Sequence, residues 1–194
     1  MAVIPANELK KKLYILVDGI PYLVLDVQFA SPSARGASTM VKARLRNLLN
    51  ATVQDKTFKT NEKFQEPDVE KVPAAFLYFT EPDYFFMDNA SYEQFSLSAA
   101  KLDEQRFYLK EGLELQALKF NGNVVSLELP DVVELSIAET EPPIKGTSSS
   151  GRSTKRAKLE TGLEVQVPMY IEPGTIVRVN TQTGEGAGEV SGRA

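Results

Sequence analysis

The chain has 194 residues, 42% of them hydrophobic and 25% charged, with a formal net charge of −4, and this composition is typical of a soluble globular protein. It contains no Cys and no His, which excludes thiol nucleophiles, His general bases, Ser-His-Asp triads and nearly all zinc sites. No apolar run approaches the roughly 20 residues that span a membrane, and the first residues lack the pattern of a signal peptide. We therefore expect a cytoplasmic protein, which the absence of Cys also fits.

Charge is distributed unevenly along the chain. Residues 1–65 carry ten Lys and Arg against five Asp and Glu, residues 66–130 carry five against twelve, and residues 131–194 carry seven against nine. A basic first third beside an acidic middle indicates that one end of the protein meets phosphate. Chance variation between domains is the alternative explanation.

The first third reads as short strands separated by turns. Residues 13–17 and 20–29 are apolar runs joined by Asp18-Gly19, a strong hairpin signal. A further strand is expected over 40–46, and another over 52–58 after a turn. About five short strands with regularly spaced turns predict a small β-barrel.

The strand expected over 40–46 carries candidate nucleic-acid contacts. Apolar and basic side chains alternate, so the strand places its apolar set on one face and three cations, Lys42, Arg44 and Arg46, on the other. Alternate residues lie about 6.6 Å apart, close to the spacing of successive phosphates on a nucleic-acid strand. We predict that the three cations contact RNA phosphates, with an ordinary solvent-facing side of a strand as the alternative.

The segment 31–39 joins these strands and is the candidate functional loop. Pro32 fixes one φ angle and Gly36 permits a positive one, so the chain can turn back on itself. Its single charge, Arg35, lies beside Gly36 and can reach into a narrow polar space. An exposed hairpin with a solvated arginine is the alternative.

Residues 69–130 form a second strand-rich unit after a linker at 66–68. Strands are expected over 75–80, 84–88, 113–120 and 124–129, and a helix over 98–106 with Ser98 as its N-cap. Six aromatic side chains in the first two strands form either a base-stacking platform or barrel core, and the acidity of this unit favours core. They are Phe76, Tyr78, Phe79, Tyr84, Phe85 and Phe86.

Residues 131–194 form a third strand-rich unit, with strands expected over 132–137, 163–167 and 175–180. The segment 141–158 reads as a long polar loop, and such loops are usually functional or disordered. It holds most of the unit's cations, namely Lys145, Arg152, Lys155, Arg156 and Lys158. No convincing internal repeat is visible between the three units.

The stretch 155–174, Lys-Arg-Ala, four residues, then Gly-Leu-Glu-Val-Gln-Val-Pro-Met-Tyr-Ile-Glu-Pro-Gly, resembles the signature of bacterial elongation factor P at every defining position. Stretches 47–49, 56–59, 86–88 and 129–135 are similar to other landmarks of that family. The whole chain resembles most closely the elongation factor P-like paralogue branch.

The resemblance implies an all-β protein of three small barrels in an L-shaped, tRNA-like arrangement. The implied domains are an SH3-like (KOW-like) domain over 1–66, a central OB domain over 67–130 and a C-terminal OB domain over 131–194. Family members bind the 70S ribosome, contacting rRNA and the peptidyl-tRNA, and stimulate peptide-bond formation when consecutive prolines stall it. The resemblance implies a monomer that is not an enzyme and needs no cofactor, metal, membrane or DNA.

The resemblance also assigns two loops. The loop that reaches the acceptor end of the peptidyl-tRNA corresponds to Ser31, Pro32, Ser33, Ala34, Arg35, Gly36 and Ala37. The loop that lies near the small subunit and the exit-site codon corresponds to Gly146, Thr147, Ser148, Ser149, Ser150, Gly151 and Arg152. The first loop is one residue longer than the usual Pro-Gly-Lys-Gly form and has no Lys, which excludes lysylation; rhamnosylation of Arg35 stays open, although the paralogue branch is thought to use an unmodified arginine.

Two alternative functions remain at this point. A generic OB-fold RNA-binding protein would bind free RNA tightly and in a salt-sensitive way, but the acidic middle third argues against it. A hydrolase with paired carboxylates, through Asp83 and Asp88, would need one acid in a cleft that raises its pKa.

Overall fold

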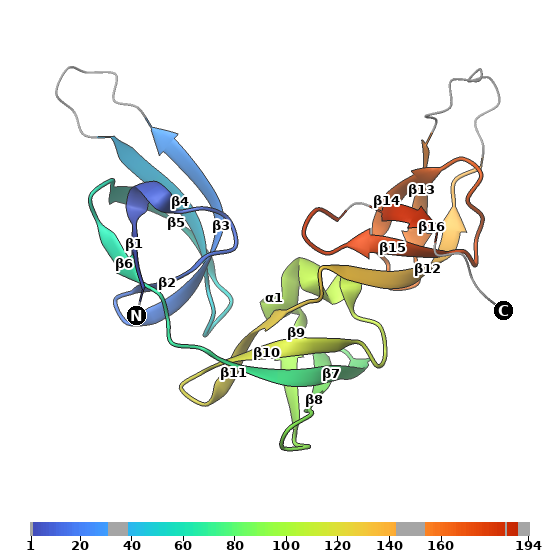
Figure 1. Cartoon of the computed structure of the whole chain (residues 1–194), viewed down its shortest axis with the longest axis horizontal. Coiled ribbons are helices and arrows are strands. Elements are labelled where there is room, and N and C mark those ends of the chain that lie inside the picture. The colour runs from blue at the N-terminus through green and yellow to red at the C-terminus, as the bar shows by residue number, and fades with distance from the viewer. Residues whose placement is uncertain (1, 31–38, 143–153, 185, 190–194) are drawn as a thin grey trace. The chain divides into compact units, whose positions relative to one another are not determined.

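Figure 1 shows the computed structural model, which describes residues 2–30, 39–142, 154–184 and 186–189. These residues form three antiparallel sheets with little helix, so the predicted all-β class is confirmed. By internal contacts the chain divides into two compact units, 1–72 with 117–126 and 73–116 with 127–194. The middle sheet contributes strands to both units.

The first sheet has the strand order β1-β6-β2-β3-β4-β5 within the described part of the chain. Its strands are β1 Val3–Pro5, β2 Tyr14–Val17, β3 Ile20–Ala30, β4 Met40–Asn47, β5 Val53–Lys59 and β6 Lys63–Gln65, with a 3-10 turn, η1, at Ala6–Glu8. The apolar positions of the alternating pattern in β4 are fully buried, since Val41, Ala43 and Leu45 have no exposed surface. They pack with Ile15 and Val24 in one core.

The middle sheet has the order β11-β10-β7-β8-β9. Its elements are β7 Glu70–Thr80, β8 Asp83–Asp88, β9 Gln94–Ser98, α1 Ala99–Leu102, η2 Asp103–Tyr108, β10 Glu114–Phe120 and β11 Asn123–Glu128. Ser98 is the N-cap of α1, and its Oγ accepts the N–H of Lys101 at 3.4 Å, as predicted. The α-helix is shorter than expected because the chain turns at Asp103, whose φ is 49°.

The aromatic side chains of β7 and β8 divide between core and surface. Phe76 and Phe86 are buried, at 6% and 0% exposure, so the core prediction is right for these two. Tyr78 and Phe79 are about half exposed, at 47% and 50%. The strand pairing shifts register between Phe76 and Tyr78, and this bulge changes which side chains face inward.

The third sheet has the order β14-β13-β12-β15-β16 in the described residues. Its strands are β12 Val132–Thr140, β13 Thr154–Leu159, β14 Glu164–Pro168, β15 Ile176–Asn180 and β16 Gly186–Glu189. Leu135, Ile137, Leu159 and Val179 form its core, and Tyr108 from η2 is buried in the same cluster. The segment that follows the middle sheet's helix therefore shares a core with the third sheet.

The expected long loop over 141–158 is wrong at its C-terminal end. β13 begins at Thr154, so Lys155, Arg156 and Lys158 lie on a strand. The reason is visible in the sequence, because Ala157 and Leu159 alternate with Arg156 and Lys158 and are buried. The polar composition of this segment led to the prediction of a loop, although one of its faces is buried.

The same tight turn ends one strand in each sheet. A side-chain Oδ1 accepts the N–H groups two and three residues ahead, while the main-chain carbonyl of the same residue accepts the N–H four residues ahead. The residue at that fourth position has a positive φ in each case. The three turns run from Asn47 to Ala51, from Asp88 to Tyr92 and from Asn180 to Gly184.

The three sheets are separated at 66–69 and at 129–131. The expected domain boundaries fall in these two connections. The division into domains over 1–66, 67–130 and 131–194 stays a prediction, because the two units defined by contacts divide the chain differently.

Candidate nucleic-acid interface

A long two-stranded ribbon leads to the predicted functional loop. β3 and β4 pair antiparallel from Tyr22 opposite Asn47 to Ala30 opposite Met40. The ribbon is held by the core below it, where Val24, Val41 and Leu45 are buried. The loop that it carries, including all of 31–37 with Arg35, lies outside the described residues.

The cation row, defined as Lys42, Arg44 and Arg46, lies along one face of β4, opposite the buried face. Lys42 and Arg44 are exposed and Arg46 is half-buried. The register extends this basic face, because Lys59 of β5 is opposite Met40, which lies on the same side of β4. The sequence alone did not indicate that Lys59 joins this face.

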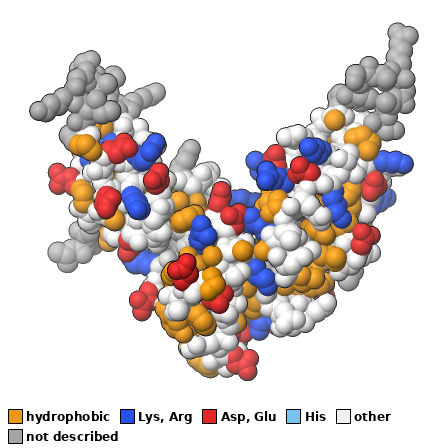
Figure 2. Space-filling model, turned by 180° about the vertical axis from the view of Figure 1, so that it is seen from behind, with side chains coloured by type: hydrophobic (Ala, Val, Ile, Leu, Met, Phe, Trp, Pro, Cys, Tyr) orange, Lys and Arg blue, Asp and Glu red, His pale blue; other side chains and the backbone are white. Residues whose placement is uncertain are grey.

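Two carboxylates from neighbouring strands lie within the cation row. Arg44 is opposite Asp26 of β3 and opposite Asp55 of β5. Lys42 Nζ lies 3.7 Å from Asp55 Oδ2, and Lys11 Nζ lies 3.3 Å from Asp26 Oδ1. Exposed pairs of this kind contribute little to stability, but the two carboxylates make the basic face less positive than the sequence of β4 suggests. In Figure 2, blue and red side chains likewise appear together on the surface rather than in separate patches.

The opposite face of β5 offers a cation in a different setting. Lys56 Nζ lies 5.3 Å from the centroid of the Tyr22 ring, and Gln54 Nε2 donates to the Tyr22 hydroxyl at 2.9 Å. Lys56 is opposite Ala43, a buried residue of β4. It is therefore a structural cation rather than part of the basic face.

The third sheet carries a second group of cations on β13. Arg156 lies 3.9 Å from Glu141 and from Glu164, and Lys158 is opposite Glu164 on β14. Both are exposed, whereas Lys155 is half-buried. The predicted loop at 146–152 lies outside the described residues, and β12 and β13 lead toward it from either side.

Asp83 and Asp88 do not form a catalytic pair. They are the first and last residues of β8, which an extended strand separates by about 16 Å, and their odd separation places them on opposite faces. Asp88 is 3% exposed and caps its turn by accepting the N–H groups of Ala90 and Ser91. This geometry excludes a hydrolase in which Asp83 and Asp88 act as paired catalytic carboxylates.

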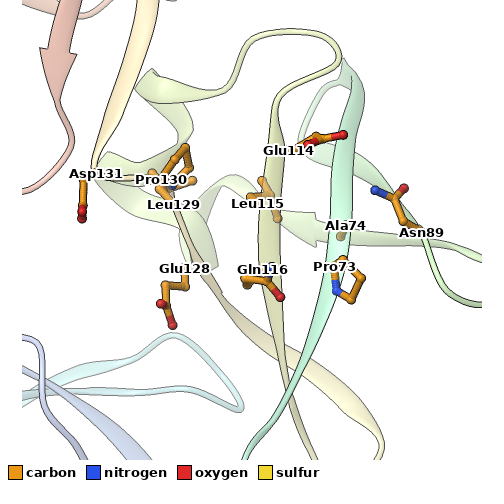
Figure 3. Close-up of a pocket in the computed structure, with 10 residues that line it drawn as sticks. All are labelled: Pro73, Ala74, Asn89, Glu114, Leu115, Gln116, Glu128, Leu129, Pro130 and Asp131. Atoms are coloured by element: carbon orange, nitrogen blue, oxygen red, sulfur yellow. The ribbon is translucent and has the colours of Figure 1, made fainter.

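A shallow pocket in the second unit has a volume of about 430 Å³. Figure 3 shows Glu114, Gln116, Glu128 and Asp131 around it, with Leu115 on its wall. Among the described residues no three acidic groups gather closely enough to hold a metal ion. None of the predicted site residues lines this pocket.

No helix in the described ranges is long and apolar enough to cross a membrane.

Comparison with known proteins covers nearly the whole chain. Residues 5–64 match the elongation factor P KOW-like domain, 69–127 the elongation factor P OB domain, and 133–185 the elongation factor P C-terminal domain. Elongation factor P 1 of Geobacter sulfurreducens is 45% identical over 176 residues, which are 91% of this chain and 94% of that protein. The chain belongs to the elongation factor P family. It is a translation elongation factor.

A second curated relative matches the chain over a similar length, and a solved structure matches it more distantly. Elongation factor P of Desulfovibrio desulfuricans is 40% identical over 179 residues, 92% of this chain and 95% of that protein. Among solved structures, eukaryotic translation initiation factor 5A from Methanococcus jannaschii has a TM-score of 0.43 and 18% identity, covering 65% of this chain and 95% of that one. That likeness is too distant to assign any residue.

Proposed function

We propose that this elongation factor P family member binds the 70S ribosome beside the peptidyl-tRNA and stimulates peptide-bond formation where consecutive prolines stall it. Arg35 is the residue at the functional tip, and the cation row grips rRNA or tRNA phosphates. The third domain binds near the small subunit through the loop at 146–152. The L-shaped arrangement, the monomeric state, the cytoplasmic location and the place in the paralogue branch stay predictions.

The observation that carries this proposal is the β3–β4 ribbon. The base of the ribbon rests on a core, where Val24, Val41 and Leu45 are buried. Pairing continues beyond that core to Ala30 opposite Met40, where the β3 side chains are exposed. One of the two strands also presents the cation row on its exposed face. A basic face on the strand that leads to the segment containing Arg35 supports a role at an RNA end.

The mechanism needs no side chain that reacts with the substrate. Holding a reactant in its reactive pose lowers the entropic part of the activation barrier, because the orientational freedom is lost on binding and not during the reaction. This effect reaches about 7–11 kcal/mol in the best model systems. Proline is a constrained and poor reactant, so orientation is what it lacks. The Arg35 guanidinium would hydrogen-bond RNA backbone or bases through its planar fork, and no enzyme activity or cofactor is required.

The deciding experiment is reconstituted translation of a message with three consecutive prolines, with recombinant unmodified protein added. We expect faster synthesis through the prolines with the natural protein. Arg35→Ala should abolish this effect while ribosome binding, measured by co-sedimentation, is retained. Arg178→Ala is the matched control, because Arg178 is an exposed arginine on β15 that lies 3.9 Å from Glu134.

Two outcomes separate the alternatives. Full rescue by Arg35→Ala would show that Arg35 is not the functional tip. Tight, salt-sensitive binding to free RNA without any effect on proline stalling would favour the generic RNA-binding protein. Mass spectrometry of Arg35 from the native host then decides whether the arginine acts unmodified.

A further inference from the structure

The outer face of the middle sheet carries a stacked aromatic pair that the proposed function does not use. Tyr78 of β7 is directly opposite Phe85 of β8, and the two rings stack with centroids 4.8 Å apart and an interplanar angle of 18°. Phe85 is followed by Phe86, which is fully buried. Because neighbouring residues of a strand point to opposite faces, the Tyr78–Phe85 pair lies on the side away from the core.

Strand pairing defines what surrounds this pair. On β8 the outer positions are Asp83, Phe85 and Met87, and on β9 Ser96 is opposite Phe85 while Ser98 is opposite Asp83. We call this surface the aromatic face, comprising Tyr78, Asp83, Phe85, Met87, Ser96 and Ser98. It holds two rings beside small polar groups and one carboxylate, with Tyr78 about half exposed.

The strands that form the aromatic face carry more carboxylates than cations, although Lys101 lies next to the face and donates its main-chain N–H to Ser98 Oγ at 3.4 Å. From 73 to 100 the sequence contains Glu81, Asp83, Asp88 and Glu93 and no Lys or Arg. Asp88 is buried in its turn, which leaves three carboxylates near the two ends of the face. A cationic partner therefore fits this surface.

We propose that the aromatic face binds an arginine-rich segment of another protein. A guanidinium stacks on an aromatic ring through cation–π attraction and at the same time pairs with a carboxylate through its planar fork. Tyr78 and Asp83 supply these two partners on one face. This proposal does not depend on the role of Arg35.

The same observations disfavour two other occupants. Phosphate contacts supply most of the affinity of proteins for nucleic acid. The segment 73–100 contains no cation to make them, and Lys101 at the edge of the face is a single charge. A second copy of this chain would bring the carboxylates of one face against those of the other. An arginine-rich peptide is the occupant that matches both the rings and the charge.

The test titrates the ¹⁵N-labelled full-length protein with a short synthetic peptide of alternating Arg and Ala. We expect saturable amide shifts confined to β7, β8 and β9. Tyr78→Ser should weaken binding about five-fold, since one cation–π contact is lost, and Tyr78→Phe should retain it. Tyr170→Ser removes a tyrosine that is 70% exposed in the third sheet and should change nothing.

Two further arms make the result decisive. Asp83→Asn removes the carboxylate but leaves the aromatic pair, so it should weaken binding even if Tyr78→Ser disturbs the strand. A peptide of alternating Lys and Ala should bind more weakly than the Arg peptide, because an ammonium does not stack. Shifts spread over acidic residues elsewhere, unchanged affinity in both variants, or oligouridine binding at this face in place of the peptide would each overturn the proposal.

Discussion

Lys110 Nζ lies 3.3 Å from Glu160 Oε1 and so connects the segment after η2 to the turn between β13 and β14. The Glu160 carboxylate also accepts the main-chain N–H of Ser136 at 2.9 Å. Partial burial alone would raise the pKa of Glu160. The hydrogen bonds from Ser136 and Lys110, together with the positive charge of Lys110, outweigh burial and hold this pKa below its ordinary value.

Glu160 should make the stability of the second unit depend on pH. Because its pKa is lower in the folded state, its contribution is fully present above about pH 5, beyond the ordinary carboxyl pKa, and is lost as the pH falls through the lower folded value. Glu160→Gln should cost about 1 kcal/mol at neutral pH, as exposed ion pairs do, and nothing at acid pH. Thermal unfolding of both proteins from neutral to acid pH measures this difference. Glu164→Gln, near Arg156 at 3.9 Å, is the control with a weaker pair.

Tyr108 should matter for stability through its ring rather than its hydroxyl. Burial, and secondarily the charge of Glu104, raises the pKa of this phenol. Tyr108→Ala should destabilise the protein by about 3 kcal/mol through the cavity that it leaves, whereas Tyr108→Phe should stay close to the natural protein. Urea unfolding measures the first effect, and ultraviolet titration should show a late-ionising tyrosine that is missing in Tyr108→Phe. Equal losses in the two variants would place the stabilisation in the hydroxyl.

The two faces of the β4–β5 pair should respond differently to loss of a cation. Arg44→Gln should weaken ribosome binding and reduce its salt slope by about 0.7–0.9, the effect of one lost phosphate contact. Lys56→Gln should leave that slope unchanged, since Lys56 faces the Tyr22 ring. Asp26→Asn should strengthen binding by removing the carboxylate opposite Arg44. A slope that is the same in all four proteins would remove the cation row from the interface.

The shared turn geometry predicts opposite effects of substitution at the same position of two turns. Ala51 has a φ of 63°, which costs an L-residue about 1–2 kcal/mol, so Ala51→Gly should stabilise the protein modestly. Gly184 has a φ of 73°, and an added Cβ would lie 3.2 Å from the Tyr108 hydroxyl, so Gly184→Ala should destabilise it. Urea unfolding of both variants is the measurement, and a loss of stability in Ala51→Gly would contradict the argument.

The sequence predicts β4 well because the alternation of apolar and basic residues along this strand indicates directly which side chains are buried. It also predicts Ser98 as a cap, since capping is a local property of residue type. It missed β13, where five of the six residues are polar or small and only the spacing of Ala157 and Leu159 marks a half-buried strand. The loop prediction for 141–158 relied on the polar composition of the segment and overlooked this spacing.

The candidate interface could be predicted only along one strand. The alternation of Lys42, Arg44 and Arg46 is local, whereas Asp26 and Asp55 enter the same face through pairing with β3 and β5. Register is a tertiary property that a strand's own sequence does not contain. The aromatic face has the same origin, because a bulge after Phe76 decides where Tyr78 lies.

The burial of Tyr108 in the core of the third sheet bears on how this chain can be divided. The C-terminal family segment begins at 133 and the OB segment ends at 127. A fragment that begins at 133 would lose Tyr108 together with Leu113 and Leu129, which also pack on that core. A recombinant third domain therefore needs the chain from η2 onward. If this domain were exchanged between relatives, the residues from η2 onward would have to be exchanged with it. We therefore expect these two parts of the chain to be inherited together.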